Sequence, residues 1–411
     1  MPKIAVIGGG ASGFFAAITA KEASPASEVA LFEKTTKLLS KVRISGGGRC
    51  NVTHACFDPR QLTGFYPRGG KELLSPFTRF QPKDTIEWFG RFGVKIVAES
   101  DGRMFPSGNT SAEIINCFLE RTENLSVPVQ TQQELSCLTP LDGGKSGWEL
   151  EFTGGKKFSA DRVILSAGSS SGLMVILAEI GYQIEPPVPS LFTFNITAPF
   201  LEGLQGISVP DAVVSVEGTR LKQSGPLLIT HWGLSGPAVL KLSAWGARIL
   251  NEINYQFTLS VNWLSGRNQD QVYSELLKLK EDQPVQKLSA RSPYGLAIKL
   301  WKRFLESAEI SESLQLKDIS QKKLHVLSGL LCCQKLQANG KSTFKEEFVT
   351  CGGVSLKQIN FSTMESRLHK NIYFTGELLD IDAVTGGFNF QACWTTGWIA
   401  GNAAASEAPI P

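Results

Sequence analysis

Three glycines near the start of the chain have the spacing Gly8-x-Gly10-x-x-Gly13 and directly follow a β-branched apolar run. Between a strand and a helix, this spacing suits a phosphate ligand: Gly8 permits the tight turn, Gly10 lets the backbone approach a pyrophosphate, and Gly13 lets the helix pack closely. The first helical turn would direct unpaired N–H groups and a partial positive charge at the phosphates, through Ala11, Ser12 and Gly13.

An acidic residue completes this motif. Glu33 stands 20 residues after Gly13 at the end of a second apolar run. There its carboxylate would accept hydrogen bonds from the ribose hydroxyls of an adenosine and would repel a 2′-phosphate. We include the adjacent Lys34 in the same site. The spacing predicts a dinucleotide site, and the alternative is a glycine-rich turn without a ligand. The fingerprint occurs once, and the rest of the chain favours FAD.

A second glycine cluster, Gly46–Gly48, lies among cationic side chains. Bare backbone N–H groups beside positive charges suit an anionic or electron-rich ring system that approaches closely. We expect Lys41 or Arg49 to stabilise a reduced flavin there, and Cys50 and Asn51 to belong to the same cofactor site. The alternative is a flexible surface loop whose charges are solvated.

Near the C-terminus, Glu377 and Asp380 follow a strand-like run, and a Gly-Gly pair opens the last helix. The two carboxylates would hold the ribityl hydroxyls of FAD. The helix start at Gly387, Phe388 and Asn389 would stabilise negative charge at N1 and the C2 carbonyl of a reduced flavin, because a helix N-terminus carries a partial positive charge. A simple strand-to-helix turn is the alternative. The predicted cofactor site also includes Val129, Ala167, Gly168 and Gly376.

His231 is the candidate catalytic residue. A histidine pKa near ~6.5 suits proton transfer at neutral pH, and its neighbours Thr230, Trp232 and Ser235 would shape a polar, aromatic-lined pocket. The alternative is a hydrogen-bonded packing histidine at the end of a strand. His54 is the other histidine considered for this role. The eight cysteines lack Cys-x-x-Cys spacing and form no cluster with the four histidines, so we expect no metal site.

The elements that must position these residues change in character along the chain. Lys3–Ile7, Phe14–Lys21 and Val29–Phe32 alternate as strand, helix and strand, the βαβ unit of a parallel sheet. After a proline cluster at residues 186–189, short strands separated by Gly and Pro follow, and Asp270 to Lys335 has helical periodicity. The sequence predicts an α/β fold with a Rossmann FAD-binding domain over residues 1–189 and 343–411. It is interrupted by an antiparallel β-barrel-like domain over 190–266 and a helical subdomain over 267–342.

Composition excludes several classes of protein. The 411 residues are enough for two to three domains, and 42% apolar with 19% charged residues is typical of a globular chain. The net charge of +3 includes no block of like charges, so nucleic acid is not the indicated partner. No run of 18 apolar residues predicts a membrane span. The start Met-Pro-Lys resembles no leader, so we expect a cytoplasmic protein.

These motifs resemble those of the BaiN-like (YhiN-type) NAD(P)/FAD-dependent oxidoreductases, a family that includes proteins similar to aminoacetone oxidase. The resemblance covers the chain end to end, and Ser-Gly-Gly-Gly-Arg-Cys-Asn at residues 45–51 is its most specific segment. It also rests on residues 6–13, 103–106, 230–238, 348–354 and 376–391. It implies a glutathione-reductase-like FAD domain split by an insertion. It also implies hydride transfer between flavin N5 and a small organic substrate, with NAD(P)H left open as a transient co-substrate.

Three departures from the family pattern stand out. His54 replaces an Asn, Cys351 replaces an Ala, and the loop after Gly168 is shorter than in the family. The shortened loop weakens any inherited substrate or NAD(P)H contact at that place. Two other functions stay open from the residues: a tRNA-modifying flavoprotein, and a non-catalytic FAD-binding regulator.

Overall fold

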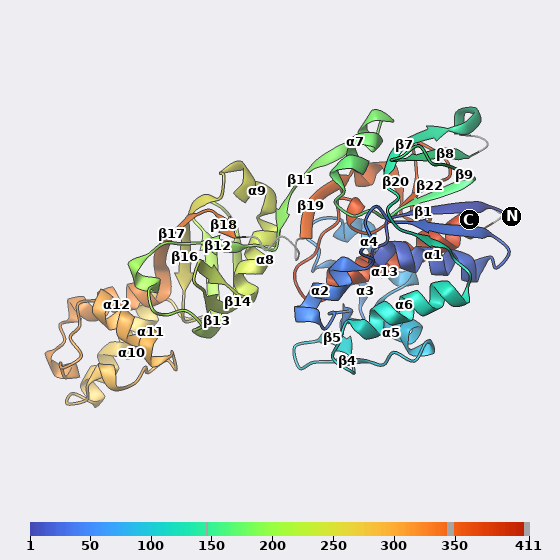
Figure 1. The fold of residues 1–411 in the computed structure, drawn as a ribbon. Helices are drawn as coiled ribbons and strands as arrows, with labels where there is room; N and C mark the ends of the chain where they lie inside the picture. Colours follow the sequence, from blue (N-terminus) through green and yellow to red (C-terminus); the bar gives the residue numbers. More distant parts are fainter. Residues whose placement is uncertain (145–146, 343–348, 407–411) are drawn as a thin grey trace. The chain divides into compact units, whose positions relative to one another are not determined.

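The computed structural model describes residues 1–144, 147–342 and 349–406. The chain divides into two compact units, Met1–Pro189 with Lys345–Pro411, and Ser190–Phe344. In Figure 1 the first unit contains both the blue N-terminal and the red C-terminal parts of the chain, and the second contains the green to orange middle. Each unit combines helices with sheets, so the fold is mixed α/β.

The first unit is built on a seven-stranded sheet with the order β20-β21-β22-β10-β1-β2-β6. The strands from β22 to β6 run parallel, and β20 and β21 extend the sheet by antiparallel pairing. Ile7 pairs with Phe32, so the glycine turn after β1 and Glu33 after β2 emerge at the same edge. The strands are β1 (Lys3–Ile7), β2 (Glu28–Phe32), β6 (Val129–Gln130), β10 (Arg162–Leu165), β20 (Ile359–Asn360), β21 (Glu365–Ser366) and β22 (Ile372–Phe374).

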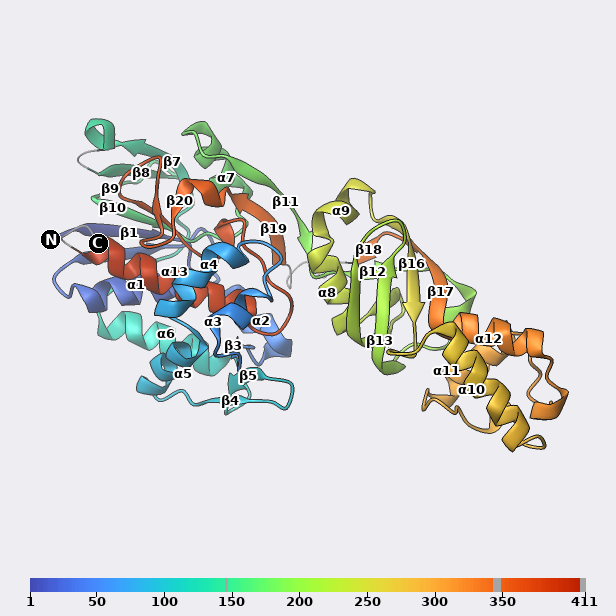
Figure 2. The ribbon, with the colours of Figure 1, turned by 180° about the vertical axis from the view of Figure 1, so that it is seen from behind.

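Two long helices from opposite ends of the chain pack side by side in this unit. They are α1 (Ala11–Ala23) and α13 (Phe388–Ala405), and both views show them together (Figures 1 and 2). A Cβ atom at Gly397 would lie 2.8 Å from the Ser12 carbonyl oxygen, and one at Gly401 would lie 2.6 Å from that of Ala16. Because Gly397 and Gly401 have no side chains, α13 can approach α1 closely at these two positions.

Smaller sheets and helices surround this core. One sheet has the order β3-β5-β4, another β7-β8-β9, and β11 pairs with β19. The strands are β3 (Thr53–His54), β4 (Ile96–Ala98), β5 (Arg103–Pro106), β7 (Leu135–Pro140), β8 (Trp148–Phe152), β9 (Lys157–Ala160), β11 (Ile184–Ser190) and β19 (Val349–Val354). The helices are α2 (Ser40–Gly48), α3 (Pro59–Thr63), α4 (Gly70–Arg79), α5 (Pro82–Arg91), α6 (Ala112–Asn124) and α7 (Ser171–Glu179).

The second unit contains a seven-stranded sheet with the order β17-β16-β13-β14-β15-β12-β18. Its pairings are antiparallel. The two edge strands β17 and β18 are separated in the chain by Gly340 alone. The strands are β12 (Thr193–Asn195), β13 (Ser208–Val216), β14 (Lys222–Ile229), β15 (Gly233–Ser235), β16 (Gln256–Asn262), β17 (Gln334–Asn339) and β18 (Lys341–Ser342).

Helices of the second unit share one hydrophobic core with this sheet. Buried Trp301 and Phe304 of α11 belong to the same cluster as Val214 and Leu259 of the strands. The helices are α8 (Pro237–Trp245), α9 (Ala247–Glu252), α10 (Gln269–Asp282), α11 (Ile298–Ser307) and α12 (Gln321–Cys333). The helical pattern read as far as Lys335 ends at Cys333, because β17 begins at Gln334 and pairs with β16. Within the described ranges, no helix combines the length and apolar character needed to cross a membrane.

Candidate functional site

The turn between β1 and α1 has the geometry that a bound pyrophosphate requires. A Cβ atom at Gly13 would overlap the Gly8 carbonyl oxygen, and one at Gly8 would lie 2.6 Å from the Ser166 carbonyl oxygen. These two glycines are therefore required by packing. A Cβ atom at Gly10 would meet no atom within 4 Å. The space before the N-terminus of α1, where Ala11 begins the helix, is thus open to a ligand.

Glu33 lies beside this turn with its carboxylate already oriented. One oxygen accepts a hydrogen bond from the Gly9 N–H at 2.8 Å, and the other accepts from the Thr35 N–H and hydroxyl, both at 2.9 Å. A carboxylate has about four acceptor positions, so Glu33 keeps capacity for a ribose hydroxyl. It lines a cavity at the carboxyl ends of β1 and β2, together with Gly8, Lys34, Gln133, Ala167 and Leu173.

Val129, Ala167 and Gly168 lie on neighbouring elements of the same sheet edge. Val129 pairs with Leu31 as the first residue of β6. Ala167 and Gly168 follow β10, which pairs with β1. A Cβ atom at Gly168 would lie 3.8 Å from a carboxylate oxygen of Glu377. Gly168 therefore lies beside Glu377 of the C-terminal motif.

Glu377 is held by partners from two other parts of the chain. It forms an ion pair with Lys41 of α2, and its second oxygen accepts a hydrogen bond from the Thr350 N–H at 2.9 Å. The preceding Gly376 donates its N–H to the Thr396 hydroxyl at 3.0 Å. Asp380 donates its own backbone N–H to the Val354 carbonyl at 3.1 Å. The positive charge of Lys41 is thus paired with Glu377.

The start of α13 is fixed by side chains that surround it. With its amide oriented to satisfy its neighbours, Asn51 accepts from the Gly387 N–H at 3.0 Å and donates to the carbonyl of Thr53 at 3.0 Å. Asn389 bonds both backbone groups of Ala383, at 2.9 and 3.1 Å. The N–H groups that follow Gly387 have no intrahelical acceptor, and no hydrogen bond found in the described ranges uses them. They present a partial positive charge.

The second glycine cluster forms a bent end to α2. Ser45, Gly46 and Gly47 leave helical geometry, and Gly46–Gly48 all have positive φ angles. Cys50, two residues after Gly48, is fully buried, and burial raises the pKa of its thiol to about 12. Cys50 is therefore a neutral thiol at neutral pH.

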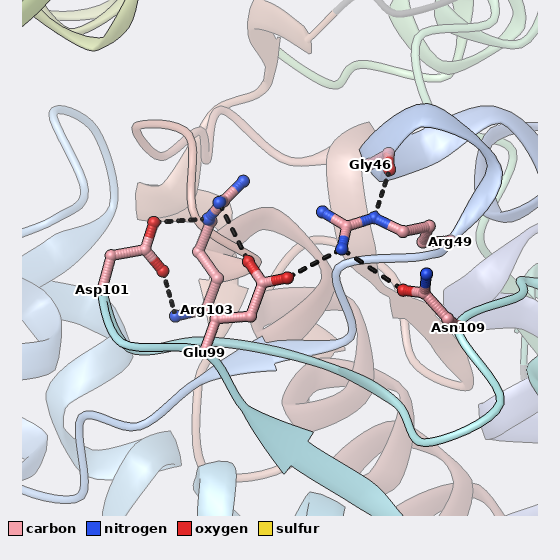
Figure 3. A network of polar contacts seen from close by, with 6 residues as sticks. All are labelled: Gly46, Arg49, Glu99, Asp101, Arg103 and Asn109. Atoms are coloured by element: carbon pink, nitrogen blue, oxygen red, sulfur yellow. Dashed lines mark hydrogen bonds and ion pairs between the residues drawn. The ribbon is translucent and has the colours of Figure 1, made fainter.

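Arg49 closes this bend through a network drawn in Figure 3. Its guanidinium bonds a carboxylate oxygen of Glu99 at 2.7 Å and the Asn109 side chain at 3.2 Å, and it lies 4.0 Å from the centre of the Phe105 ring. The other oxygen of Glu99 bonds Arg103 at 3.0 Å. The charge of Arg49 is therefore directed toward Glu99 in the β4–β5 hairpin. From the sequence we had expected this charge to face a flavin.

His231 lies elsewhere, in the second unit. It is exposed and follows β14 in a turn whose Thr230 N–H bonds the Gly233 carbonyl at 2.8 Å. Trp232 beside it is 58% exposed. The structure thus places His231 on an exposed turn, and the packing alternative does not apply to an exposed ring.

Several residues of this region escaped the sequence analysis. Arg68 forms a bidentate ion pair with Asp382, which is fully buried. The Tyr66 hydroxyl donates to the Phe388 carbonyl at 2.6 Å. Asp382 belongs to the C-terminal motif, and an acidic residue between apolar neighbours could have marked it as a buried, functional side chain. Nothing in the sequence marks Arg68 or Tyr66 in this way.

Comparison with known proteins agrees with this geometry. A family model described as the HI0933-like protein Rossmann domain matches residues 2–403. The chain belongs to the HI0933-like family. It is 28% identical to a ribosomal RNA dihydrouridine synthase of Escherichia coli, over 96% of this chain and 95% of that protein. It is 26% identical to a 3-dehydro-bile acid delta(4,6)-reductase of Clostridium scindens, over 99% of this chain and 100% of that protein.

A solved structure shows the same fold. The 3-ketosteroid delta1-dehydrogenase of Sterolibacterium denitrificans aligns with a TM-score of 0.55 over 98% of this chain and 99% of that chain, at 12% identity. Together with the family, this likeness supports the Rossmann-type FAD-binding fold. The HI0933-like chain is an FAD-dependent oxidoreductase. The open space at Gly10, the cavity at Glu33 and the unpaired N–H groups of α13 fit that cofactor.

Proposed function

We propose that this enzyme adds two hydrogen atoms across a carbon–carbon double bond conjugated to a carbonyl group of a small organic substrate. When bound, reduced FAD supplies a hydride from its N5. The observation that carries the proposal is the start of α13, where unpaired N–H groups after Gly387 offer a fixed positive potential in the unit that also holds the dinucleotide turn. Such preorganised donors would stabilise the negative charge that the ring system of a bound flavin gains when NAD(P)H reduces it.

We propose that different residues of the first unit bind different parts of the cofactor. Ala11, Ser12 and Gly13 would donate N–H groups to the pyrophosphate, and Glu33 would accept from the ribose. Lys34, Val129 and Ala167 would surround the adenosine. Gly168, Gly376, Glu377, Asp380 and Lys41 would hold the middle of the molecule, and Cys50, Asn51, Gly387, Phe388 and Asn389 would lie at the ring system. We assign Arg49 to holding the Gly46–Gly48 bend in place.

The finer architecture is part of this proposal. We propose a glutathione-reductase-like FAD domain with a barrel-like insertion, since Gly340 alone separates the two edge strands of the second sheet. The insertion carries His231, which we propose as the group that gives a proton to the substrate. NAD(P)H is proposed as the source of the two electrons.

The names of the relatives support this chemistry. Dihydrouridine is uridine reduced at a double bond conjugated to a ring carbonyl, and a delta(4,6)-reductase of a 3-dehydro compound reduces a conjugated enone. Both reactions saturate a bond whose carbonyl accepts developing negative charge. The same arrangement of flavin and donors would serve both.

Anaerobic stopped-flow spectroscopy of the purified holoenzyme tests the proposal. NADH or NADPH should bleach the flavin absorbance, and an enone steroid should then restore it without oxygen, with one equivalent of saturated product. Reduction by amines and reoxidation by oxygen alone would instead indicate an oxidase. A flavin that no nicotinamide, amine or enone reduces or reoxidises would indicate a non-catalytic FAD-binding regulator.

One observation favours a second candidate, uridine in structured RNA. The inserted residues 190–344 contain 17 Lys and Arg against 12 Asp and Glu, whereas the rest of the chain contains 24 against 26. The positive balance of the chain therefore lies in the insertion, as expected for a unit that faces phosphates. Ribosomal RNA transcripts replace the enone in the reoxidation step of the same experiment. RNA that restores the absorbance and gains dihydrouridine, where enones do not, would select this candidate.

A further inference from the structure

His54 lies where two segments of the cofactor site meet. Its ring stacks on the ring of Phe388, the first residue of α13, with centroids 4.7 Å apart and an interplanar angle of 22°. Phe388 stacks in turn on Phe65, at 4.2 Å and 11°. The His54 and Phe65 rings lie 5.8 Å apart with an interplanar angle of 33°, so the three rings form one cluster at the start of the last helix.

The imidazole also contacts the turn of the β4–β5 hairpin. A Cβ atom at Gly102 would lie 2.5 Å from a carbon of the His54 ring, so the glycine backbone rests against it. The Cys56 N–H bonds the His54 carbonyl at 2.8 Å, and His54 pairs with Arg103 across the β3–β5 ladder. The ring therefore fills the space between this hairpin and Phe388.

This hairpin also holds the Gly46–Gly48 bend, through the ion pair of Glu99 with Arg49. Two segments assigned to the flavin, the bend and the start of α13, therefore rest on the same hairpin, one through Glu99 and the other through His54. A change in the His54 ring would move the helix start relative to the bend.

We propose that His54 is a positioning residue whose ring, held between Gly102 and Phe388, sets the place of the α13 N-terminus and thereby the affinity for FAD. This inference rests on the proposed cofactor site. The neutral form of the imidazole is the one that fits between Gly102 and Phe388. The Nδ1 atom is buried without a hydrogen-bond partner among the described residues, and a positive charge there would oppose the partial charge at the start of α13.

The surroundings of His54 favour its neutral form. Burial lowers its pKa below the usual value, and the Asp101 backbone and carboxylate oppose this only in part, while Arg103 lowers it further. Asp101 and Arg103 are the charged groups that face the ring from the hairpin. Phe65, Gly386 and Phe388, which face it from the other elements, carry no charge.

The test compares His54→Phe, which keeps a stacking ring without a titratable group, with His54→Ala, which removes the ring. FAD dissociation constants of the full-length apoprotein are measured by flavin fluorescence from pH 7.5 to 5.5. At pH 7.5 we expect His54→Ala to weaken FAD binding about tenfold and His54→Phe by less than about threefold. The wild-type protein should lose affinity as the pH falls, and His54→Phe should lose less.

The exposed His325→Phe in the second unit is the matched control and should behave as wild type. Circular dichroism shows whether His54→Ala folds; if it does not, the comparison of wild type with His54→Phe across pH decides. Wild-type affinity for FAD in His54→Ala, or the same pH dependence in His54→Phe as in wild type, would overturn the inference. A wild-type protein that takes up no FAD would instead refute the proposed function.

Discussion

Lys41 and Glu377 are 336 residues apart in the chain and form an ion pair. Lys41 belongs to the bent helix α2, and Glu377 follows the last strand of the parallel sheet, β22. The pair therefore ties the N-terminal glycine bend to the C-terminal motif. Its side chains are 48% and 16% exposed, so Glu377 is the more deeply placed partner.

We expect Glu377 to matter more for FAD than Lys41. Glu377→Ala removes the ion pair and the acceptor of the Thr350 N–H, so FAD affinity should fall about tenfold, which corresponds to about 1.4 kcal/mol. Lys41→Met removes only a half-exposed, screened charge, so it should weaken the free energy of FAD binding by less than about 1 kcal/mol. Titration of apoprotein with FAD measures both constants. An equal loss in the two variants would contradict the distinct role of Glu377.

Two glycines of the same motif should respond differently to alanine. Gly10→Ala places its methyl group in open space, so the unfolding free energy of the apoprotein should change little while FAD affinity falls about tenfold or more. Gly13→Ala forces its methyl group against the Gly8 carbonyl and should destabilise even the apoprotein by about 1–3 kcal/mol. Urea unfolding and FAD titration separate the two effects. If Gly10→Ala bound FAD normally, the pyrophosphate would not lie at this turn.

The ion pair between Arg68 and Asp382 should be essential for stability. Asp382 is fully buried, so Arg68→Met would leave a carboxylate inside the protein without this cation. We expect a loss of about 3–5 kcal/mol in the free energy of unfolding, because removing the cation of a buried ion pair is costly. The double variant Arg68→Met with Asp382→Leu should recover part of that loss. Urea denaturation measures both, and a loss below about 1 kcal/mol in Arg68→Met would show that the carboxylate is otherwise compensated.

The stability of the apoprotein should depend on the protonation of His54. Burial lowers the pKa of His54 in the folded protein below its usual 6.5, so the unfolded chain binds more protons as the pH falls below that value. The contribution of His54 to the free energy of unfolding is fully present above about pH 6.5. It is lost as the pH falls from there through the lowered pKa of the folded protein. Urea unfolding at pH 7.5 and 5.5 should show a smaller decrease in His54→Phe than in wild type. An identical decrease would mean that other groups carry the dependence.

The dinucleotide motif is recognisable from local features of the chain. The strand, the glycine turn, the helix and Glu33 follow one another within the first 33 residues, and their periodicity and spacing are visible without any knowledge of distant contacts. The C-terminal motif was recognisable for the same reason, since Gly386 and Gly387 directly precede the helix they open. The predicted strands Lys3–Ile7 and Val29–Phe32 correspond to β1 (Lys3–Ile7) and β2 (Glu28–Phe32).

The availability of the charges depends on contacts between distant parts of the folded chain. Arg49 and Lys41 looked like free cations beside a glycine cluster, yet each has a carboxylate partner, in Glu99 and Glu377. The stack of His54 on Phe388 joins residues far apart in the chain. Side-chain pairing of this kind depends on which distant segments of the chain meet in the folded protein. Local periodicity does not encode these long-range contacts. The sequence therefore specified the phosphate-binding turn, whereas packing between the two ends of the chain specified the surroundings of the ring system.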